Sequence, residues 1–524
     1  MKEGFRQSMA WLHTWSGLVF GWLLFAIFFT GTLSYFKAEI SHWMQPEVPA
    51  RAVSTDSSLA LAQGYLQQHA NGAGRWFINL PDAREPALSV MWQGPVKPGE
   101  RGAFTEKLLD PATGSEIQAR DTRGGEFFYR FHFQLQMPHP WGRWLATSAA
   151  MVMFVALISG IITHKKIFKD FFTFRPRKGQ RSWLDGHNAV GVLVLPFHLM
   201  ITYSSLVIFM SMVMPASILA SYNGNARAFF DEVFPASATP ELAGKPAELA
   251  PLAPLLEKAR EQWSGGQVGR LTVNNPGDAN ASVVLVRDGA DRVVHDFGRA
   301  ATFNGVTGQL LDTTPEQSLP RAIAGSFYGL HMGRFADPVL RWLYFICGLA
   351  GTAMIGTGLV VWLGKRQLKH AKSGVMPFEL RLVEVLNIAS MSGLMIAIAA
   401  FFWANRLLPV SFAERSTWEV QTFFIAWGLS LLHALLRRGR QGWVEQLSFG
   451  ALLFIAIPLL NALTTPYHLG TSLARGDWAM AGFDLTCLAS GVFLGWAAWK
   501  MQHRTAAQPK VERARSLTLK QEAH

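Results

Sequence analysis

The chain has 524 residues, of which 50% are hydrophobic and only 16% are charged, whereas a typical soluble domain has about 25% charged residues. This composition excludes a wholly soluble enzyme, a disordered chain and a disulfide scaffold, and it indicates a polytopic membrane protein with some water-exposed mass. The net charge of +12 does not by itself indicate nucleic acid, because the basic residues adjoin apolar stretches. Cys347 and Cys487 lie far apart in apolar segments, so they build neither a disulfide framework nor a thiolate metal site.

Eight stretches that carry no charge, or almost none, are candidate membrane spans, since about 20 apolar residues cross a bilayer. The last stretch is interrupted only by Asp484, which we expect at the membrane interface near the outer end of its helix. In chain order the stretches are 7–36, 144–163, 186–226, 342–364, 385–405, 420–436, 446–474 and 478–499.

Basic residues predict the orientation of these spans, because loops rich in Lys and Arg stay in the cytoplasm. They gather in the N-terminus, in the connection 164–185, in 365–372, in 437–440 and in the tail. With the N-terminus inside, all five segments are cytoplasmic. We therefore expect a multi-pass protein of the bacterial inner membrane with both termini in the cytoplasm, and a charge excess that needs no nucleic acid.

The expected fold class is mostly α: a helical membrane bundle of about eight spans, with two α+β domains in the periplasm. Each outer segment is long enough for a small domain and contains short strand-like runs, such as 87–92 and 282–286. The expected boundaries are 1–37 for the first span, 38–138 for the first outer domain, 139–215 for the second and third spans with the basic loop 164–185, 216–335 for the second outer domain, 336–370 for the fourth span, 371–502 for an appended four-helix bundle, and 503–524 for a cytoplasmic tail.

An internal repeat runs through the first 370 residues. In the outer segments, the Asp-Pro-Ala-Thr-Gly turn at 110–114 is similar to Asn-Gly-Val-Thr-Gly at 304–308. In the spans, His13 and His187 are each followed by glycine after 4 residues and by Thr or Ser after 17. His132 and His331 each precede an Arg-Trp pair, and a Ser-Gly or Thr-Gly pair comes sixteen residues after that arginine, at 159–160 and 357–358. Parallel repeats imply a pseudo-twofold axis along the membrane normal, with shared sites at the repeat interface.

The repeat pairs the histidines. His13 and His187 lie at the cytoplasmic ends of spans one and three, and His132 and His331 lie before the outer ends of spans two and four. Two residues that face each other across such an axis suit an iron porphyrin, which takes axial ligands from opposite sides. The sequence therefore predicts two hemes, one near each membrane face. A zinc or copper site is disfavoured, since no carboxylate or thiolate clusters with these histidines and no HExxH motif is present.

His198 leaves the outer ligand set open. It follows His187 by 11 residues, on nearly the same helix face and about 16 Å further along the axis. It is therefore an alternative outer ligand that replaces His132 or His331. His164 is a weaker candidate beside the cytoplasmic pair, whereas His433 and His468 in the appended bundle are interpreted as structural.

Several of these motifs together resemble one family. They are Leu12–Leu18 with Thr30-Gly31, Gly186–Gly191, Gly329–Arg334 and the turn at 110–114. The chain resembles, over about residues 8–370, the PepSY-associated transmembrane family of iron-regulated bacterial inner-membrane proteins. The resemblance implies PepSY-like outer domains, two b-type hemes, and reduction of a ferric siderophore or other ferric chelate by electrons passed across the membrane. The four C-terminal helices exceed the family's four-helix core.

The resulting hypothesis is a di-heme b reductase that supports iron acquisition. Outer-sphere electron transfer needs no protein acid or base, so no catalytic residue is assigned. The chain has no dinucleotide fingerprint, so the electron donor is a separate cytoplasmic reductase or a membrane quinol. Two alternatives remain: a cofactor-free regulator of periplasmic peptidases, and a transporter of iron chelate or heme, which broken helices would favour. Pro196 could break the third span in this way.

Overall fold

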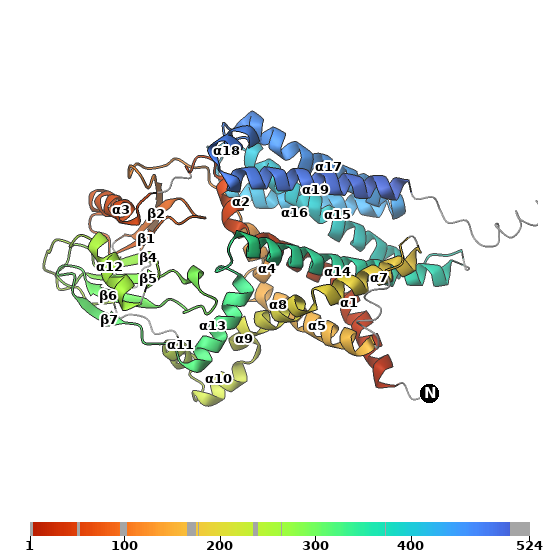
Figure 1. The fold of residues 1–524 in the computed structure, drawn as a ribbon, viewed down its shortest axis with the longest axis horizontal. Coiled ribbons are helices and arrows are strands. Elements are labelled where there is room, and N and C mark those ends of the chain that lie inside the picture. The colour runs from red at the N-terminus through yellow and green to blue at the C-terminus, as the bar shows by residue number, and fades with distance from the viewer. Residues whose placement is uncertain are drawn as a thin grey trace, which may run out of the picture.

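The computed structural model of the protein describes residues 4–49, 53–94, 102–164, 174–176, 178–233, 239–263, 265–371 and 374–503. A bundle of long helices makes up one part of the molecule, and a β-sheet with its own helices makes up the other (Figure 1). We call the end of the bundle next to the sheet the sheet end, and the opposite end the far end. Helix α1 begins and helix α19 ends at the far end (Figure 1).

Seven of the eight predicted spans are confirmed by length and composition, since seven single helices in the described residues are long and apolar enough to cross a membrane. The predicted third span corresponds to two helices, α7 and α8, which pass the same test together but are bent by 67° at their junction. The seven are α1 (Phe5–Ser34), α5 (Trp141–Thr163), α14 (Pro338–His370), α15 (Phe378–Leu407), α16 (Arg415–Leu436), α17 (Gly439–Thr464) and α19 (Trp478–Gln502), and the bent pair is α7 (Gln180–Leu193) and α8 (Leu195–Ile208).

The bend in the third span lies where Pro196 was expected to break it. Val194 has non-helical backbone angles (φ −109°, ψ 18°), and α8 begins at the next residue with Pro196 in its first turn. Proline lacks the N–H that would continue the hydrogen-bond ladder, and it clashes with the preceding turn. Helix α1, which occupies the corresponding place in the first repeat, is continuous over 30 residues.

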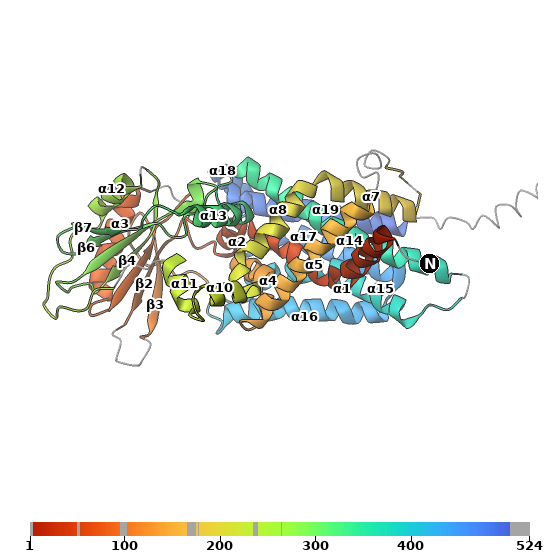
Figure 2. The same ribbon diagram turned by 90° about the horizontal axis from the view of Figure 1, so that it is seen from below.

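The shorter helices lie between the spans and beside the sheet (Figures 1 and 2). Two of them, α4 and α13, directly precede α5 and α14 and carry a histidine each. The shorter helices are α2 (Lys37–Met44), α3 (Thr55–His69), α4 (Glu126–Gln134), α9 (Met210–Val213), α10 (Pro215–Ser221), α11 (Ala226–Val233), α12 (Ala253–Gln262), the 3-10 turn η1 (Gly289–Asp291), α13 (Leu319–Met332) and α18 (Leu469–Arg475).

The two outer segments share one antiparallel sheet of seven strands, in the order β3-β2-β1-β4-β5-β6-β7. Strand β1 of the first segment pairs with β4 of the second, with Phe77 opposite Thr272. The segments expected as two domains are therefore joined edge to edge, and α3 and α12 pack on this common sheet around one apolar core. The strands are β1 (Arg75–Asn79), β2 (Leu88–Gln93), β3 (Phe104–Leu109), β4 (Val268–Asn274), β5 (Ser282–Arg287), β6 (Ala300–Asn304) and β7 (Leu310–Thr313).

The repeat seen in the sequence is also present in the structure. Both Thr-Gly turns close in the same way, since the N–H of Gly114 donates to Asp110 and the N–H of Gly308 donates to Asn304, at 2.8 and 2.9 Å. Both glycines have positive φ, at 73° and 66°, a conformation that side chains disfavour. The pairing of β1 with β4 places the pseudo-twofold axis at the centre of the sheet.

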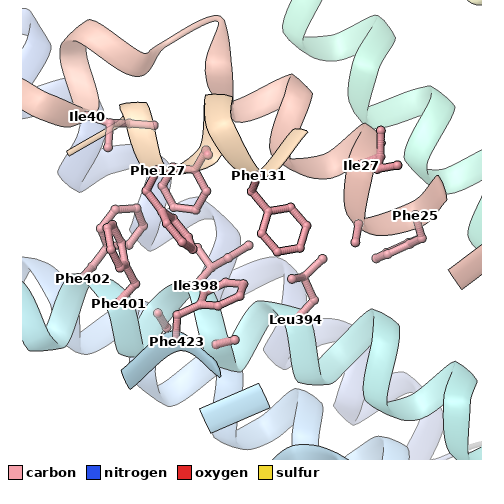
Figure 3. Packing of buried hydrophobic residues seen from close by; sticks show 14 of the residues in the cluster. Phe25, Ile27, Ile40, Phe127, Phe131, Leu394, Ile398, Phe401, Phe402 and Phe423 are labelled. Carbon is pink, nitrogen blue, oxygen red and sulfur yellow. The ribbon is translucent and has the colours of Figure 1, made fainter. Parts of the chain in front are cut away.

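The five C-terminal helices α15–α19, which we call the appended helices, run alongside the first 370 residues, and at the sheet end they contact α4. Phe127 and Phe131 of α4 meet Phe401 and Phe402 of α15 and Phe423 of α16 in a buried aromatic cluster (Figure 3). The rings of Phe127 and Phe401 stack with centroids 4.6 Å apart. The appended helices therefore support α4 from one side.

The prediction of an interfacial Asp484 is wrong. Only 1% of this residue is exposed. Its carboxylate accepts hydrogen bonds from the indole N–H of Trp43 at 2.9 Å and from the amide of Asn461 at 3.1 Å. A buried carboxylate needs such partners. They come from α2 and α17, so the sequence around Asp484 in α19 gives no sign of them.

Candidate functional site

His13 and His187 form a facing pair near the far end. His13 lies on α1 and His187 on α7, and their ring centroids are 6.3 Å apart with ring planes at 61°. The Nδ1 of His13 is 2.8 Å from the carbonyl oxygen of Ala156 on α5. The Nδ1 of His187 is 2.9 Å from the carbonyl oxygen of Met354 on α14. Because a carbonyl only accepts hydrogen bonds, Nδ1 carries the proton in both rings and Nε2 keeps its lone pair.

His132 and His331 form a second facing pair at the sheet end. Their centroids are 6.0 Å apart and their planes are at 35°. The Nδ1 of His132 donates to the carbonyl oxygen of Ile27 at 2.8 Å, and the Nδ1 of His331 is 2.9 Å from the hydroxyl of Ser204. The pair therefore repeats the arrangement of the first, with each Nδ1 held by a neighbouring span.

The ends of α4 and α13 place these two histidines. Each helix ends in a residue with left-handed backbone angles, Leu135 after α4 and Gly333 after α13. The N–H of each of these residues caps the last helical turn, by donating to Phe131 and Gly329 respectively. Such a cap stops the helix directly after the histidine turn, so both rings project from the last turn of a short helix into the space between the repeats.

Three glycines let the spans approach the imidazoles closely. A Cβ added at Gly31 would lie 2.5 Å from Nδ1 of His132. A Cβ at Gly160 would lie 3.0 Å from the His13 ring, and a Cβ at Gly358 would lie 3.1 Å from the His187 ring. The last two are the glycines of the Ser-Gly and Thr-Gly repeat pairs. The sequence therefore contained a signal for this close contact, although the repeat alone did not show that these glycines face the histidines.

The spacing of both pairs fits an ion held between two axial imidazoles. An imidazole nitrogen binds a metal at about 2.0 Å, and the ring centre lies about 1.1 Å behind that nitrogen, so two opposed rings on one ion have centroids about 6 Å apart. Across the described residues, no hydrogen bond occupies Nε2 of any of the four rings. The residues present therefore fit the axial ligation of an iron porphyrin.

A site for a metal ion without a porphyrin is not found in the described part of the chain. No group of three or more His, Cys, Asp or Glu side chains there is placed to hold such an ion. Protein zinc sites use three or four side-chain ligands, whereas heme iron needs only one or two from the protein because the porphyrin supplies the others.

A model of the PepSY-associated TM region matches residues 10–365. The match covers more than half of the chain and contains both histidine pairs. The chain belongs to the PepSY-associated transmembrane family. No curated protein matches the chain. The expected membership is thus confirmed, and the appended helices lie outside the matched region, which we call the family core.

His198 lies apart from both pairs. No part of it is exposed, and neither ring nitrogen has a hydrogen-bonding partner in the described residues. Its ring lies edge-on to Phe28 at 6.4 Å and beside Phe197 at 6.2 Å. It is placed between the two pairs along the bundle, and its counterpart in the first repeat is Leu24. Among the described residues its ring contacts phenylalanines and no other histidine, and its role as an outer ligand stays a prediction.

Three further histidines, His164, His433 and His468, make hydrogen bonds within the protein. His164 bonds through Nε2 to the amide of Asn188 at 3.0 Å, beside His187 but outside the pair. His433 bonds to the carboxylate of Glu445 at 2.9 Å and to Gln446 at 3.2 Å. His468 precedes α18, where its carbonyl accepts the N–H of Ser472. These contacts agree with a structural role for the last two.

Proposed function

We propose that this protein is a di-heme b reductase of the bacterial inner membrane, which passes electrons across the membrane to a ferric siderophore or other ferric chelate and so supports iron acquisition. The observation that carries the proposal is the presence of two facing histidine pairs, one toward each end of the family core. His13 and His187 would hold one heme, and His132 and His331 the other. A heme bound in this way supplies a reversible one-electron couple.

The protein's part in this function is to fix and orient the imidazoles. Each Nδ1–H donates to an oxygen on a neighbouring span, which sets the tautomer and makes Nε2 the more basic nitrogen. The glycines on α1, α5 and α14 keep that neighbouring backbone within reach. Two members of each pair come from different repeats, so correct packing of the two halves is a condition for ligation.

The distribution of basic residues supports the orientation. Arginines at the far-end termini of α1, α14, α16 and α17 favour a cytoplasmic far end. These arginines are Arg6, Arg366, Arg437, Arg438 and Arg440. With the far end in the cytoplasm, the sheet would lie in the periplasm. Lys165, Lys166, Lys169, Lys372 and the tail from residue 504 onward, which contributed to the same expectation, lie outside the described residues.

A cavity of about 980 Å³ between the sheet and the helices offers a place for the ferric chelate. Its lining includes Arg270, His295 and Arg334. Arg334 follows His331 by three residues, and the His295 ring lies 4.6 Å from Tyr328 on α13, one turn before His331. The cavity is therefore about one helical turn from the sheet-end pair, and its volume is within the range of about 300–1,000 Å³ usual for small-molecule sites.

Reduction would loosen the bound metal. Hard oxygen donors bind Fe(III) more tightly than Fe(II), so a reduced chelate releases its iron more readily. The transfer of an electron to such a chelate breaks no covalent bond, so it requires no nucleophile or general base from the cavity.

The heme content of the purified protein tests the proposal. After expression with ample heme, we expect two b-type hemes per chain in a reduced-minus-oxidised spectrum. His13→Ala and His187→Ala should remove the same heme, and His132→Ala and His331→Ala should remove the other. His433→Ala is the matched control and should keep both, because its partners Glu445 and Gln446 lie in the appended helices. A protein without heme under these conditions would overturn the proposal.

One observation favours the transporter among the alternatives, namely the break between α7 and α8. A transporter would move iron chelate or heme into proteoliposomes without any reductant, and its activity would survive loss of the facing histidines. The repeats are parallel, however, and each histidine pair takes one member from each repeat, an arrangement that transport does not require.

A further inference from the structure

A second cavity, of about 800 Å³, lies at the far end between the family core and the appended helices. One wall is formed by α7 and α14, and the other by α15, α17 and the last residues of α19. We propose that this cavity binds a membrane quinol, the electron donor for the reductase; the inference rests on the proposed function and gives the appended helices a task in it.

The walls of the cavity suit a lipid-soluble ligand. They are mostly apolar and aromatic, and they include Trp183, Val360, Leu363, Leu368, Met376 and Trp443. Leu368 is 65% exposed, so the cavity is open to the surroundings of the bundle. Its other lining residues include the ends of α14 and α19 and the start of α17, which places it near the membrane boundary, where the head of a quinol resides.

A free hydrogen-bond donor lines this apolar space. Asn387 on α15 is only 1% exposed, and its Nδ2 has no partner in the described residues. Its Oδ1 accepts the indole N–H of Trp22 at 2.8 Å. That bond fixes the orientation of the amide, because a flipped amide would set two donors against each other. The amide N–H₂ is therefore left to donate to an oxygen of a ligand, and a buried donor without a partner is rare in proteins.

A proton acceptor lies one turn away on the same helix. Glu384 precedes Asn387 by three residues, so both project from one face of α15, and both line the cavity. The Glu384 side chain is hydrogen-bonded to Gln367 of α14. A quinol ring carries two hydroxyl groups, so one can accept from Asn387 while the other donates to Glu384.

The cavity is close to the far-end histidine pair. Trp183 precedes His187 by one turn on the same face of α7, a rise of about 6 Å. On α14, Gly358 meets the His187 ring, and Leu363, which lines the cavity, follows five residues later. Along both helices the cavity is therefore only about 6–8 Å from the level of the pair.

The reaction balances with the acceptor already proposed. Oxidation of one quinol to the quinone breaks two O–H bonds and releases two electrons and two protons. The first proton passes to the Glu384 carboxylate and the second to water at the mouth of the cavity. The two electrons reduce two ferric chelates at the sheet end, one electron each.

Binding can be measured on the full-length protein in detergent with a decyl-tailed ubiquinone as the probe. Quenching of Trp183 and Trp443 fluorescence reports occupancy of the cavity, and the signal should weaken in Trp183→Phe. Asn387→Leu should raise the dissociation constant about tenfold, the size of effect expected for one buried hydrogen bond. Trp22→Phe removes the same indole bond but keeps the amide donor, so it should weaken binding less than Asn387→Leu does.

The role of the Glu384 carboxylate is tested with a matched control on the same helix. Glu384→Gln should slow quinol-driven reduction at least tenfold, whereas Glu379→Gln, in the exposed first turn of the same helix, should leave the rate unchanged. The proposal is overturned if Asn387→Leu and Glu384→Gln behave as the unmodified protein. It is also overturned if phospholipid without a quinone head displaces the probe completely, since the cavity would then be a lipid site.

The test separates this proposal from the di-heme proposal. Quinone binding that persists in His187→Ala supports the cavity site whether or not heme is present. If the protein contains two hemes that dithionite reduces, but neither binds quinone nor accepts electrons from quinol, the reductase stands and the quinol site fails.

Discussion

The aromatic cluster between α4 and the appended helices predicts that one histidine pair can be disturbed from a distance. Phe401 on α15 is fully buried and stacks on Phe127 of α4. It also meets Phe128 edge-on at 5.5 Å. His132 lies on the same short helix, one residue after Phe131 of the cluster. Phe401→Ala should therefore loosen α4 and, with it, the sheet-end pair alone.

The expected size of the effect follows from packing. Replacing a buried phenylalanine by alanine costs about 3–5 kcal/mol in soluble cores. In a membrane the contribution from water exclusion is small and packing dominates, so we expect about 2–3 kcal/mol at this site. That change raises the fraction of molecules with a displaced α4 by roughly 30- to 150-fold.

The assay is a redox titration that resolves the two proposed hemes. Phe401→Ala should lower the occupancy or shift the midpoint potential of the sheet-end heme and leave the far-end heme unchanged. Phe454→Ala is the control, since Phe454 is buried in the same apolar core but lies on α17, away from the stacked rings of Phe127 and Phe401. Equal loss of both hemes, or no change in either, would refute the idea that the appended helices position His132.

Three further changes probe the two centres and the sheet. Gly31→Ala should abolish the sheet-end heme, because its Cβ would lie 2.5 Å from Nδ1 of His132; two hemes per chain in this variant would show that the close approach is not needed. Gly358→Ala places its Cβ 3.1 Å from the His187 ring, so it should shift the midpoint potential of the far-end heme without removing it, as seen in the same titration. In the sheet region, backbone N–H groups lower the pKa of Asp278. Its stabilising effect is therefore present above the usual carboxyl pKa and is lost as the pH falls through the lowered value. Thermal unfolding of Asp278→Asn should depend less on pH below about 4 than that of the unmodified protein, and identical pH profiles would contradict this role.

Much of the core could be predicted from the sequence, because its signals are local and repeated. A run of apolar residues between charges is sufficient to locate a span, and Pro196 locates the bend in the third. The equal spacing from His13 to Thr30 and from His187 to Ser204 predicts that the two halves superpose. Such signals depend on neighbours in the chain, which is why the histidine pairs could be named before the structure was known.

The features that were not predicted depend on contacts between distant segments. The pairing of β1 with β4 joins residues about 195 positions apart, and neither strand carries a mark of its partner. Asp484 is buried because Trp43 and Asn461 reach it from other helices. The free amide of Asn387 becomes visible only when Trp22 is seen to occupy its oxygen. In each case the feature arises from the contact of two elements, so the residues next to it in the chain do not predict it.

The joined sheet has a consequence for how such a centre arises. Strands β1 and β4 border each other across the pseudo-twofold axis, and each facing imidazole has its mate in the other half of the chain. This is the geometry of an isologous homodimer whose subunits have been fused. A polypeptide half as long as the family core could assemble the same scaffold from two identical copies, and each facing pair would then consist of the same histidine from both copies. In a single chain the two halves can differ, as Leu24 and His198 do at equivalent positions.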